Sequence, residues 1–396
     1  MTIRIGKPEI DLRQKLTELQ TPSGIAGRAV LSANTPQEQF NLIGAGRKRL
    51  NINGAFNVWQ RGTSTTTTPG QVKYIADRYK CYHSNVATSN LTWAQSTDAP
   101  PGFAYSFRVD CTVSDTSLAA ATEVNFYHHF EGQDLQHLKK GTPEALPVTV
   151  SFWVKANVTG KFYVELMDND NSNRHCNIPY EIKELNVWEY KTITFPGDTT
   201  GTLNNDNGDS FHVAFWLTAG SSYNGSSNAQ VWTNLNQSKR ASGQYNFTNN
   251  TNNEIRFAGI QLEAGNVATP FEHRSYGEEL DLCERYYQLL DISGMQITKA
   301  TTGTSYSNAD LQASIPFRTV MRDTPSFGNI ASGTTLTANA YTSTYASAGS
   351  YEISGFVKSP HLLGFGYQQA VNGGVSLPAN VTMLGLTDDG YLDAEL

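Results

Sequence analysis

The chain has 396 residues, of which 16% are charged and 11% aromatic, and its formal net charge is −7. This length allows two or three compact units, and the abundance of Thr, Ser, Asn and Gly favours β-sandwiches over helical bundles or coiled coils. The negative charge argues against a nucleic-acid-binding protein, because phosphate binding needs a basic surface.

The first predicted unit, residues 1–49, lacks a core of its own. A short helix is expected over residues 9–20, before the breaking sequence Thr21-Pro22-Ser23-Gly24. Its apolar stripe consists of Leu12, Leu16 and Leu19. Because a helix this short is marginal alone, we predict that residues 1–49 are an arm that docks onto another protein. For the basic cluster Arg47-Lys48-Arg49 two interpretations stay open, a solvated turn or a contact to an acidic neighbouring protein in an assembly.

Residues 50–274 show strand after strand, separated by turn sequences. Apolar residues alternate most clearly over 148–154, 162–166 and 211–217. Many short strands without a helical pattern predict an antiparallel sandwich. In the row 124–130, His128 shares a face with Phe126 and Phe130, which favours a core histidine over a metal ligand.

The last strand of this unit is expected over residues 255–262. Simple alternation places Arg256, Ala258, Ile260 and Leu262 on one face, and Ile255, Phe257 and Gly259 on the other. Both faces carry apolar residues, so the strand is expected to be covered on both sides.

A connector and a second unit follow. Ser275 and Glu278 have the spacing of a capping box, and apolar residues then recur at helical spacing, which predicts a connector helix over residues 275–290. Residues 291–396 are rich in Gly, Ser and Thr, and the rows 311–317 and 351–357 predict a second, smaller β domain.

Few residues point to chemistry. The four cysteines, Cys81, Cys111, Cys176 and Cys283, are too far apart for a zinc cluster or a disulfide framework, so buried free thiols are expected. The run 168–173 resembles a calcium loop only at its first positions, which favours a hydrated turn. No nucleotide-binding or nucleophile-elbow motif is present.

The strongest binding candidates are aromatic residues within polar loops. Tyr223, Trp232 and Asn234 lie among Ser and Asn residues, and aromatic rings beside amides suit sugars. The alternative is that Tyr223 and Trp232 are packing residues of a long loop.

Three runs carry a resemblance to a known class of protein. These are 50–62, which contains Asn53-Gly54-Ala55-Phe56 and Trp59, the run 151–156, and the run 259–287, which begins Gly-Ile-Gln-Leu-Glu and contains Cys283-Glu284-Arg285-Tyr286-Tyr287. They resemble phage virion proteins identified as tail fibres or structural proteins. The order of strands resembles jelly-roll carbohydrate-binding modules, which open on a strand like that at Asn53–Trp59 and close on the Gly-Ile-Gln-Leu-Glu strand.

The resemblance implies a homotrimer. It also allows a structural calcium ion, for which no ligands can be assigned from the sequence. No other cofactor is expected. We therefore predict a mainly β protein: an antiparallel jelly-roll sandwich with a short helical N-terminal arm, a connector helix and a second small β domain. The expected function is that of a non-enzymatic structural protein of a phage virion, most simply a tail fibre or appendage that binds a host-surface glycan.

The alternatives are a capsid decoration or head-fibre protein and, from another class, a glycan depolymerase, although the repetitive β-helix with clustered acids expected of one is absent from the sequence. Other virion proteins are the expected partners of residues 1–49. The start lacks the apolar core of a secretory signal and no run reaches the ~20 apolar residues of a membrane span, so we expect a soluble protein made in the host cytoplasm and located in the virion.

Overall fold

The structure is a computed structural model. It describes residues 49–225 and 229–290, the segments 296–299, 311–328, 335–341, 346–358, 362–369, 380–382 and 390–396, and the single residues Ser32 and Gln39. Of the predicted docking arm, only Ser32, Gln39 and Arg49 are described, and Leu12, Leu16 and Leu19 lie outside the described residues.

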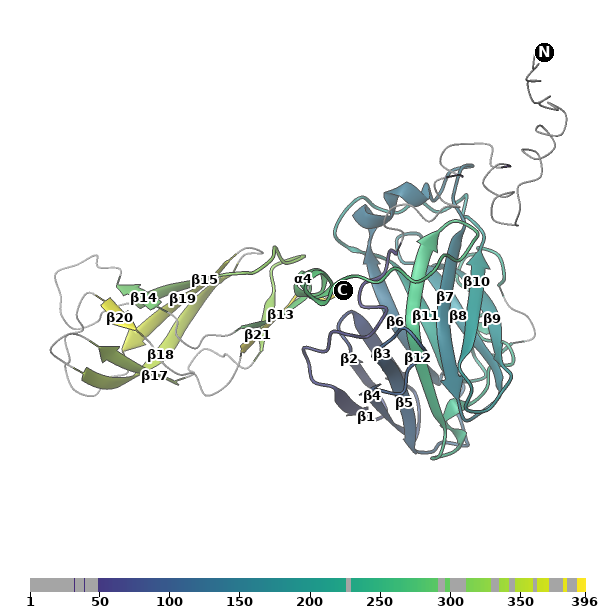
Figure 1. Cartoon of the computed structure of the whole chain (residues 1–396), viewed down its shortest axis with the longest axis horizontal. Coiled ribbons are helices and arrows are strands. Elements are labelled where there is room, and N and C mark those ends of the chain that lie inside the picture. Colours follow the sequence, from purple (N-terminus) through teal and green to yellow (C-terminus); the bar gives the residue numbers. More distant parts are fainter. Residues whose placement is uncertain are drawn as a thin grey trace, which may run out of the picture.

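Two six-stranded antiparallel sheets pack face to face and form a jelly-roll sandwich, as the alternating rows predict (Figure 1). Sheet A has the order β1 (Ser64–Thr67), β4 (Asn90–Ser96), β5 (Ser106–Val113), β12 (Glu254–Ala264), β7 (Val148–Ala156) and β10 (Glu189–Phe195). Sheet B has the order β2 (Gln71–Tyr74), β3 (Tyr79–Ser84), β6 (Glu123–Glu131), β11 (Asp209–Ala219), β8 (Gly160–Asp168) and β9 (Arg174–Ile182). Three 3₁₀ helices, η1 (Gly132–Leu138), η2 (Gln237–Lys239) and η3 (Phe247–Asn249), lie in the connections.

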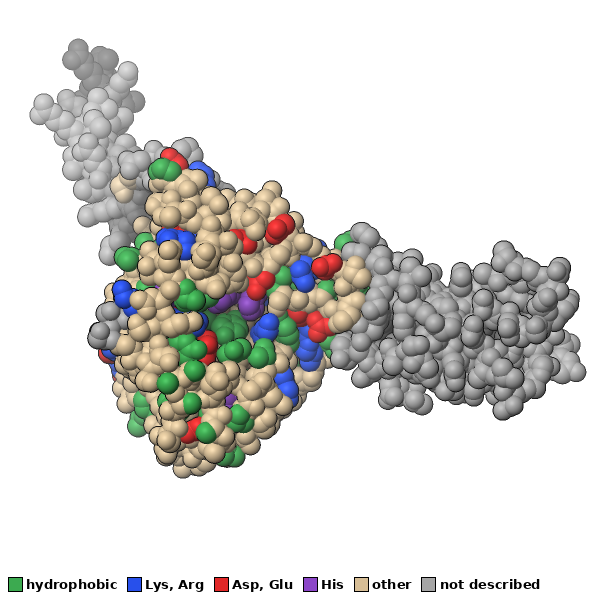
Figure 2. Space-filling model, turned by 180° about the vertical axis from the view of Figure 1, so that it is seen from behind, with side chains coloured by type: hydrophobic (Ala, Val, Ile, Leu, Met, Phe, Trp, Pro, Cys, Tyr) green, Lys and Arg blue, Asp and Glu red, His purple; other side chains and the backbone are tan. Residues whose placement is uncertain are grey.

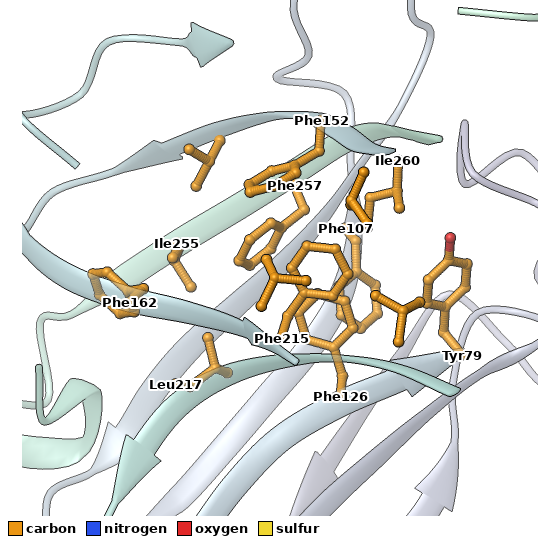
Figure 3. Packing of buried hydrophobic residues seen from close by; sticks show 14 of the residues in the cluster. Tyr79, Phe107, Phe126, Phe152, Phe162, Phe215, Leu217, Ile255, Phe257 and Ile260 are labelled. Atoms are coloured by element: carbon orange, nitrogen blue, oxygen red, sulfur yellow. The ribbon is translucent and has the colours of Figure 1, made fainter. Parts of the chain in front are cut away.

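Aromatic side chains fill the space between the sheets (Figure 3). Phe126 of sheet B stacks on Phe215 at 4.9 Å between ring centroids and meets Phe257 of sheet A edge-on at 5.0 Å. The predicted rows on β7, β8 and β11 all point into this core. Burial of so much apolar area is the main force that holds the sheets together.

His128 is a core residue, as predicted. It is buried beside Phe130 at 4.6 Å, and its Nε2 accepts a hydrogen bond from the Ile52 amide at 3.0 Å. Burial, with Arg78 and His129 nearby, holds its pKa well below the usual value. All four cysteines are buried free thiols, which confirms that expectation.

The predicted faces of β12 are wrong beyond Gly259. That residue has φ of 60°, and the pairing with β7 shifts between Ala258 and Gln261. The bulge reverses the alternation, so Ile260 joins Phe257 in the core instead of lying on the opposite face. Simple alternation cannot reveal a bulge, although a glycine within a strand is a known signal for one.

The predicted opening strand at Asn53–Trp59 is also wrong. This segment consists of turns, with φ of 56° at Asn53 and 55° at Phe56. The Asn53 side chain accepts from the Val58 amide at 3.0 Å and donates to the Val58 and Asp77 carbonyls, and these bonds stabilise the turn against an extended strand.

The connector helix is shorter than predicted. Helix α4 covers Tyr276–Glu284, capped by Ser275, and Tyr287–Leu290 form strand β13 instead of a further helical turn. Strand β13 pairs with β21 (Gly390–Asp393), so a partner distant in the sequence overrides the helical spacing.

Arg49 belongs to the two-sheet body. It is buried, forms a β-bridge with Glu263 and pairs with Glu279 of α4. This excludes the solvated turn for Arg49 and places its acidic neighbour within the same chain. Arg47 and Lys48 lie outside the described residues.

The C-terminal part contains further antiparallel strands. β13, β21 and β16 (Ser326–Gly328) form one sheet, and a second has the order β17 (Thr335–Tyr341), β18 (Ala346–Lys358), β19 (Leu362–Gln369), β15 (Leu311–Pro316), β14 (Gln296–Lys299) and β20 (Asn380–Thr382). The predicted rows 311–317 and 351–357 fall on β15 and β18. Residues 393–396 return to the body, where Glu395 pairs with the buried Arg78.

We expect Gly259→Ala to lower the free energy of unfolding by at least about 2 kcal/mol, since a left-handed residue with a Cβ costs about 1–2 kcal/mol and the new methyl would also displace a ring. Its Cβ would lie 2.4 Å from Cζ of Phe103. Urea unfolding of the full chain measures this. The matched control is Gly277→Ala in α4, whose Cβ would meet nothing within 4 Å. It should be neutral or stabilising by up to about 1 kcal/mol. Equal effects at the two positions would contradict the bulge argument.

Candidate functional site

The outer face of sheet B, opposite the core, carries an unusual set of side chains. Because Phe211, Val213 and Phe215 of β11 point inward, His212 and Trp216 point outward. The β-ladders pair His212 with His129 of β6 and with Met167 of β8. Neighbouring rows hold Tyr127, Glu165 and Tyr82, so aromatic and ionisable groups cover the middle of the sheet.

Two histidines form the floor of this face. The ring centroids of His129 and His212 are 5.2 Å apart, and each ring also lies within 5.5 Å of Tyr127. Nδ1 of His129 lies 2.9 Å from Oδ1 of Asp209, which also accepts from the Asn169 side chain at 3.0 Å. Each histidine keeps only 7% of its surface exposed. On the face seen in Figure 2, histidine, hydrophobic and charged side chains gather in a hollow.

Several polar atoms here have no partner among the described residues. They are both ring nitrogens of His212, Nε2 of His129 and Oδ1 of Asn125. A buried polar atom without a hydrogen bond costs about 1–3 kcal/mol, so natural structures seldom leave several together. These atoms are enclosed, so a ligand that brings donors and acceptors would satisfy them only after the surrounding side chains move aside. We call this site, defined by Tyr82, Tyr127, His129, Asp209 and His212, the histidine hollow.

The loop that follows β11, described over residues 220–225 and 229–245, forms one wall. Arg240 reaches from it to Glu165, with Nη2 2.7 Å from Oε2, and the same carboxylate accepts from Trp216 Nε1 at 3.0 Å. Burial alone would raise the pKa of Glu165, but Arg240 and His175 hold it well below the usual value. The loop is thus tied to the sheet by a buried ion pair, which holds the wall in place.

Tyr223, predicted as a sugar-binding residue, belongs to this wall. Its ring packs on Trp216 at 5.4 Å and lies 5.4 Å from the Arg240 guanidinium. Burial raises the pKa of Tyr223 to about 12. On the opposite side, Lys80 and Tyr74 bind the Leu396 carbonyl, so residues 393–396 border the same face.

Trp232 and Asn234 lie elsewhere. Trp232 packs on Phe211 at 6.0 Å and donates from Nε1 to the Pro196 carbonyl at 2.7 Å, while Asn234 accepts from Arg174 at 3.1 Å. The structure does not bring these two residues to Tyr223, and their role in sugar binding stays a prediction.

A pocket of 570 Å³ opens near Trp232 beside η1. Its lining residues include Leu135, Lys140 and Leu203. The Lys140 ammonium is already paired with Asp168, with Asp198 at 2.9 Å, and with the Gly201 carbonyl. Because its central charge is satisfied within the chain, the pocket indicates a ligand less strongly than the histidine hollow does.

Neither a metal site nor a membrane span emerges from the described part of the chain. No group of three or more His, Cys, Asp or Glu residues there could hold a metal ion. Asp168 accepts from the amides of Asp170 and Asn171 at 2.9 and 3.1 Å, so its carboxylate organises the turn that was compared with a calcium loop. No helix among the described residues is long and apolar enough to cross a membrane.

Sequence reasoning missed the histidine hollow because its residues lie on three different strands, β3, β6 and β11. The signal was nevertheless present: the pair His128-His129 alternates around a core row, so one ring had to face outward. His212 alternates in the same way between Phe211 and Val213. The two outward rings meet only because β6 pairs with β11, and this pairing cannot be read from the sequence.

Comparisons with known proteins found only distant structural similarities. No family model matches the chain, and no curated protein matches its sequence. Among solved structures, the enzymatically active domain of tailspike protein 4 from bacteriophage CBA120 is similar over 54% of this chain and 21% of that chain, with 11% identity and a TM-score of 0.28.

Carbohydrate-binding modules are also similar. A CBM4 structure matches over 54% of this chain and 97% of its own, with 11% identity and a TM-score of 0.28. The CBM22-1 xylan-binding domain of Paenibacillus barcinonensis Xyn10C matches over 57% of this chain and 100% of its own length, with 9% identity and a TM-score of 0.27. Similarities this distant carry no functional assignment.

We expect the stability of the protein to fall as the pH drops from about 6.5 towards 3, in part because of His212. Burial and the neighbouring His129 lower the pKa of His212 from 6.5 to about 3, opposed by Glu165 and Asp209. In this window the unfolded chain binds a proton that the folded chain does not, so the group destabilises the fold as the pH falls. Between pH 7 and pH 5 the effect is about 1–2 kcal/mol.

The test compares urea unfolding of the wild type with His212→Asn at both pH values. Between pH 7 and pH 5, the free energy of unfolding of the variant should fall by about 1–2 kcal/mol less than that of the wild type. The same pH dependence in both proteins would mean that folding does not lower the pKa of His212. His137→Asn, at an exposed position on η1, is the control and should leave the pH dependence unchanged.

Proposed function

We propose that this chain is a non-enzymatic structural protein of a phage virion, a tail fibre or appendage that binds a glycan on the host surface through the histidine hollow. The observation that carries the binding role is the pair His129 and His212. Both are more than nine-tenths buried on an outward sheet face, and three of their four ring nitrogens lack a partner among the described residues.

A sugar suits the chemistry of the hollow. A neutral imidazole has one donor and one acceptor, and sugar hydroxyls offer both. The rings of Tyr82 and Tyr127, 6.1 Å apart, provide apolar surface for sugar C–H groups, and Asp209 can accept from hydroxyls. The buried ion pair of Glu165 with Arg240 keeps one wall fixed, which reduces the entropy lost on binding.

The virion role is supported by sequence motifs that resemble phage structural proteins, most completely over residues 259–287. In this proposal residues 1–49 dock onto other virion proteins and the assembly is a homotrimer. The remaining alternative within the class is a capsid decoration or head-fibre protein.

We expect His212→Ala and Tyr82→Ala each to weaken glycan binding about tenfold or more, because each removes a ring or a hydrogen-bonding group worth about 1.4 kcal/mol. A glycan array of bacterial surface polysaccharides, followed by calorimetry on the best ligand, measures this. His137→Ala is the matched control, since His137 is exposed on η1 and lies outside the hollow. Unchanged affinity in both hollow variants would overturn the site.

Location in the particle is tested by cryo-electron microscopy of intact virions. Trimeric density at the tail is the expected result. Density distributed over the capsid lattice would replace the tail-fibre proposal with the decoration protein. Release of reducing ends from host polysaccharide by the purified chain would contradict the non-enzymatic role.

A further inference from the structure

The outer face of sheet A carries a group of aromatic side chains, of which Tyr190 is exposed and Trp153 is half-buried. Trp153 of β7 and Tyr190 of β10 are cross-strand partners, with ring centroids 5.2 Å apart and ring planes inclined by 52°. Both point away from the core, because Phe152 and Val154 on either side of Trp153 point into it. Tyr190 keeps 46% of its surface exposed. Trp188, half-buried, lies one row further along the same edge.

One of these rings, Trp188, is held in place by a polar contact at its border. Trp188 donates from Nε1 to Oδ1 of Asp98 at 3.3 Å. The other oxygen of Asp98 lies 2.8 Å from the Lys155 ammonium and 3.6 Å from Nε of Arg256. One carboxylate thus fixes an indole and two cations, so little side-chain freedom remains to be lost when a ligand binds.

A ladder of alternating charges runs from the rings towards β5. Its cations are Arg108, Lys155 and Arg256, and its acids are Asp98, Asp110 and Glu254. Three positive and three negative charges cancel, so this face has no net attraction for a polyanion. It offers a row of fixed donors and acceptors beside an aromatic surface.

We propose that the aromatic platform, defined by Trp153, Trp188 and Tyr190, is a second carbohydrate-binding surface, and that it takes an extended uncharged polysaccharide chain. Flat rings exposed on a sheet face stack against the C–H faces of successive sugars, and the neighbouring ladder binds their hydroxyls. The absence of net charge argues against nucleic acid and against highly sulfated or phosphorylated polymers.

The platform is independent of the histidine hollow. The hollow lies on the outer face of sheet B and the platform on the outer face of sheet A, with the aromatic core between them. No hydrogen bond, ion pair or ring contact given for the described residues joins the two sites directly. Each can therefore be removed without the other.

The test is affinity electrophoresis of the full chain through gels that contain dextran, xylan, mixed-linkage β-glucan or heparin. We expect retardation in at least one uncharged polysaccharide and none in heparin. Tyr190→Ala and Trp153→Ala should each weaken the apparent affinity about tenfold, since each removes one stacking ring. Tyr276→Ala is the matched control, because Tyr276 is 59% exposed on α4, away from both sheets.

The outcomes separate the two sites. Retardation that survives Tyr190→Ala and Trp153→Ala but is lost in His212→Ala would overturn the platform and leave the hollow standing. The reverse pattern would support the platform and count against the hollow. Retardation of the wild type in none of the gels, or only in heparin, would overturn the platform as described.

Light scattering of the same variants provides a second readout. The platform proposal expects Tyr190→Ala to keep the oligomeric mass of the wild type. A loss of mass to the monomer would identify this face as a contact between copies of the chain and would overturn the proposal.

Discussion

The two-sheet body depends on one left-handed backbone position, Gly259 in the central strand β12. The bulge at this residue turns Ile260 into the core and directs its amide to the Gly54 carbonyl at 2.9 Å. The Asn51 side chain then bonds the Ile260 carbonyl and the Leu262 amide, both at 2.8 Å. A single change of backbone conformation therefore completes the core and also fastens the segment before β1 onto sheet A.

Buried charge is used differently in two parts of the molecule. Glu165 and Arg240 are desolvated together and hydrogen-bonded to each other, and Glu165 also accepts from Trp216, so the cost of burying the pair is offset locally. His129 and His212, one row away, are just as buried but leave ring nitrogens unpaired. Other buried side chains, among them Arg49, Arg61 and Arg78, also keep polar atoms without a partner among the described residues. The hollow differs because such atoms belong to two histidine rings that lie side by side.

The sequence predicted the fold class well because alternating apolar rows are a local property. The rows on β7, β8 and β11, the inward His128 and the buried cysteines all follow from period-two alternation. The errors come from features that simple alternation does not describe. The Gly259 bulge is a change of backbone conformation within a strand, the turn at Asn53 is stabilised by bonds to Val58 and Asp77, and the pairing of β13 with β21 joins residues distant in the sequence.

The candidate site was harder to predict for the same reason. Tyr223 was singled out as a loop aromatic, and it does border the hollow, but the histidines at its floor come from β6 and β11, more than 80 residues apart in sequence. A composition-based search favours aromatic loops, whereas a site built on a sheet face appears only when strand order and register are known.

The two proposed surfaces differ in shape, and this has a consequence for how such a protein would adhere. Sheets in a sandwich pack about 10 Å apart, so one short oligosaccharide cannot reach both outer faces. The enclosed hollow suits a chain end or a branch, while the open platform suits the run of a polymer. A long surface polysaccharide could engage both, and the second contact would then form at a high effective concentration. Weak individual sites would suffice for firm attachment, and each would still release quickly enough to let the particle move along the surface.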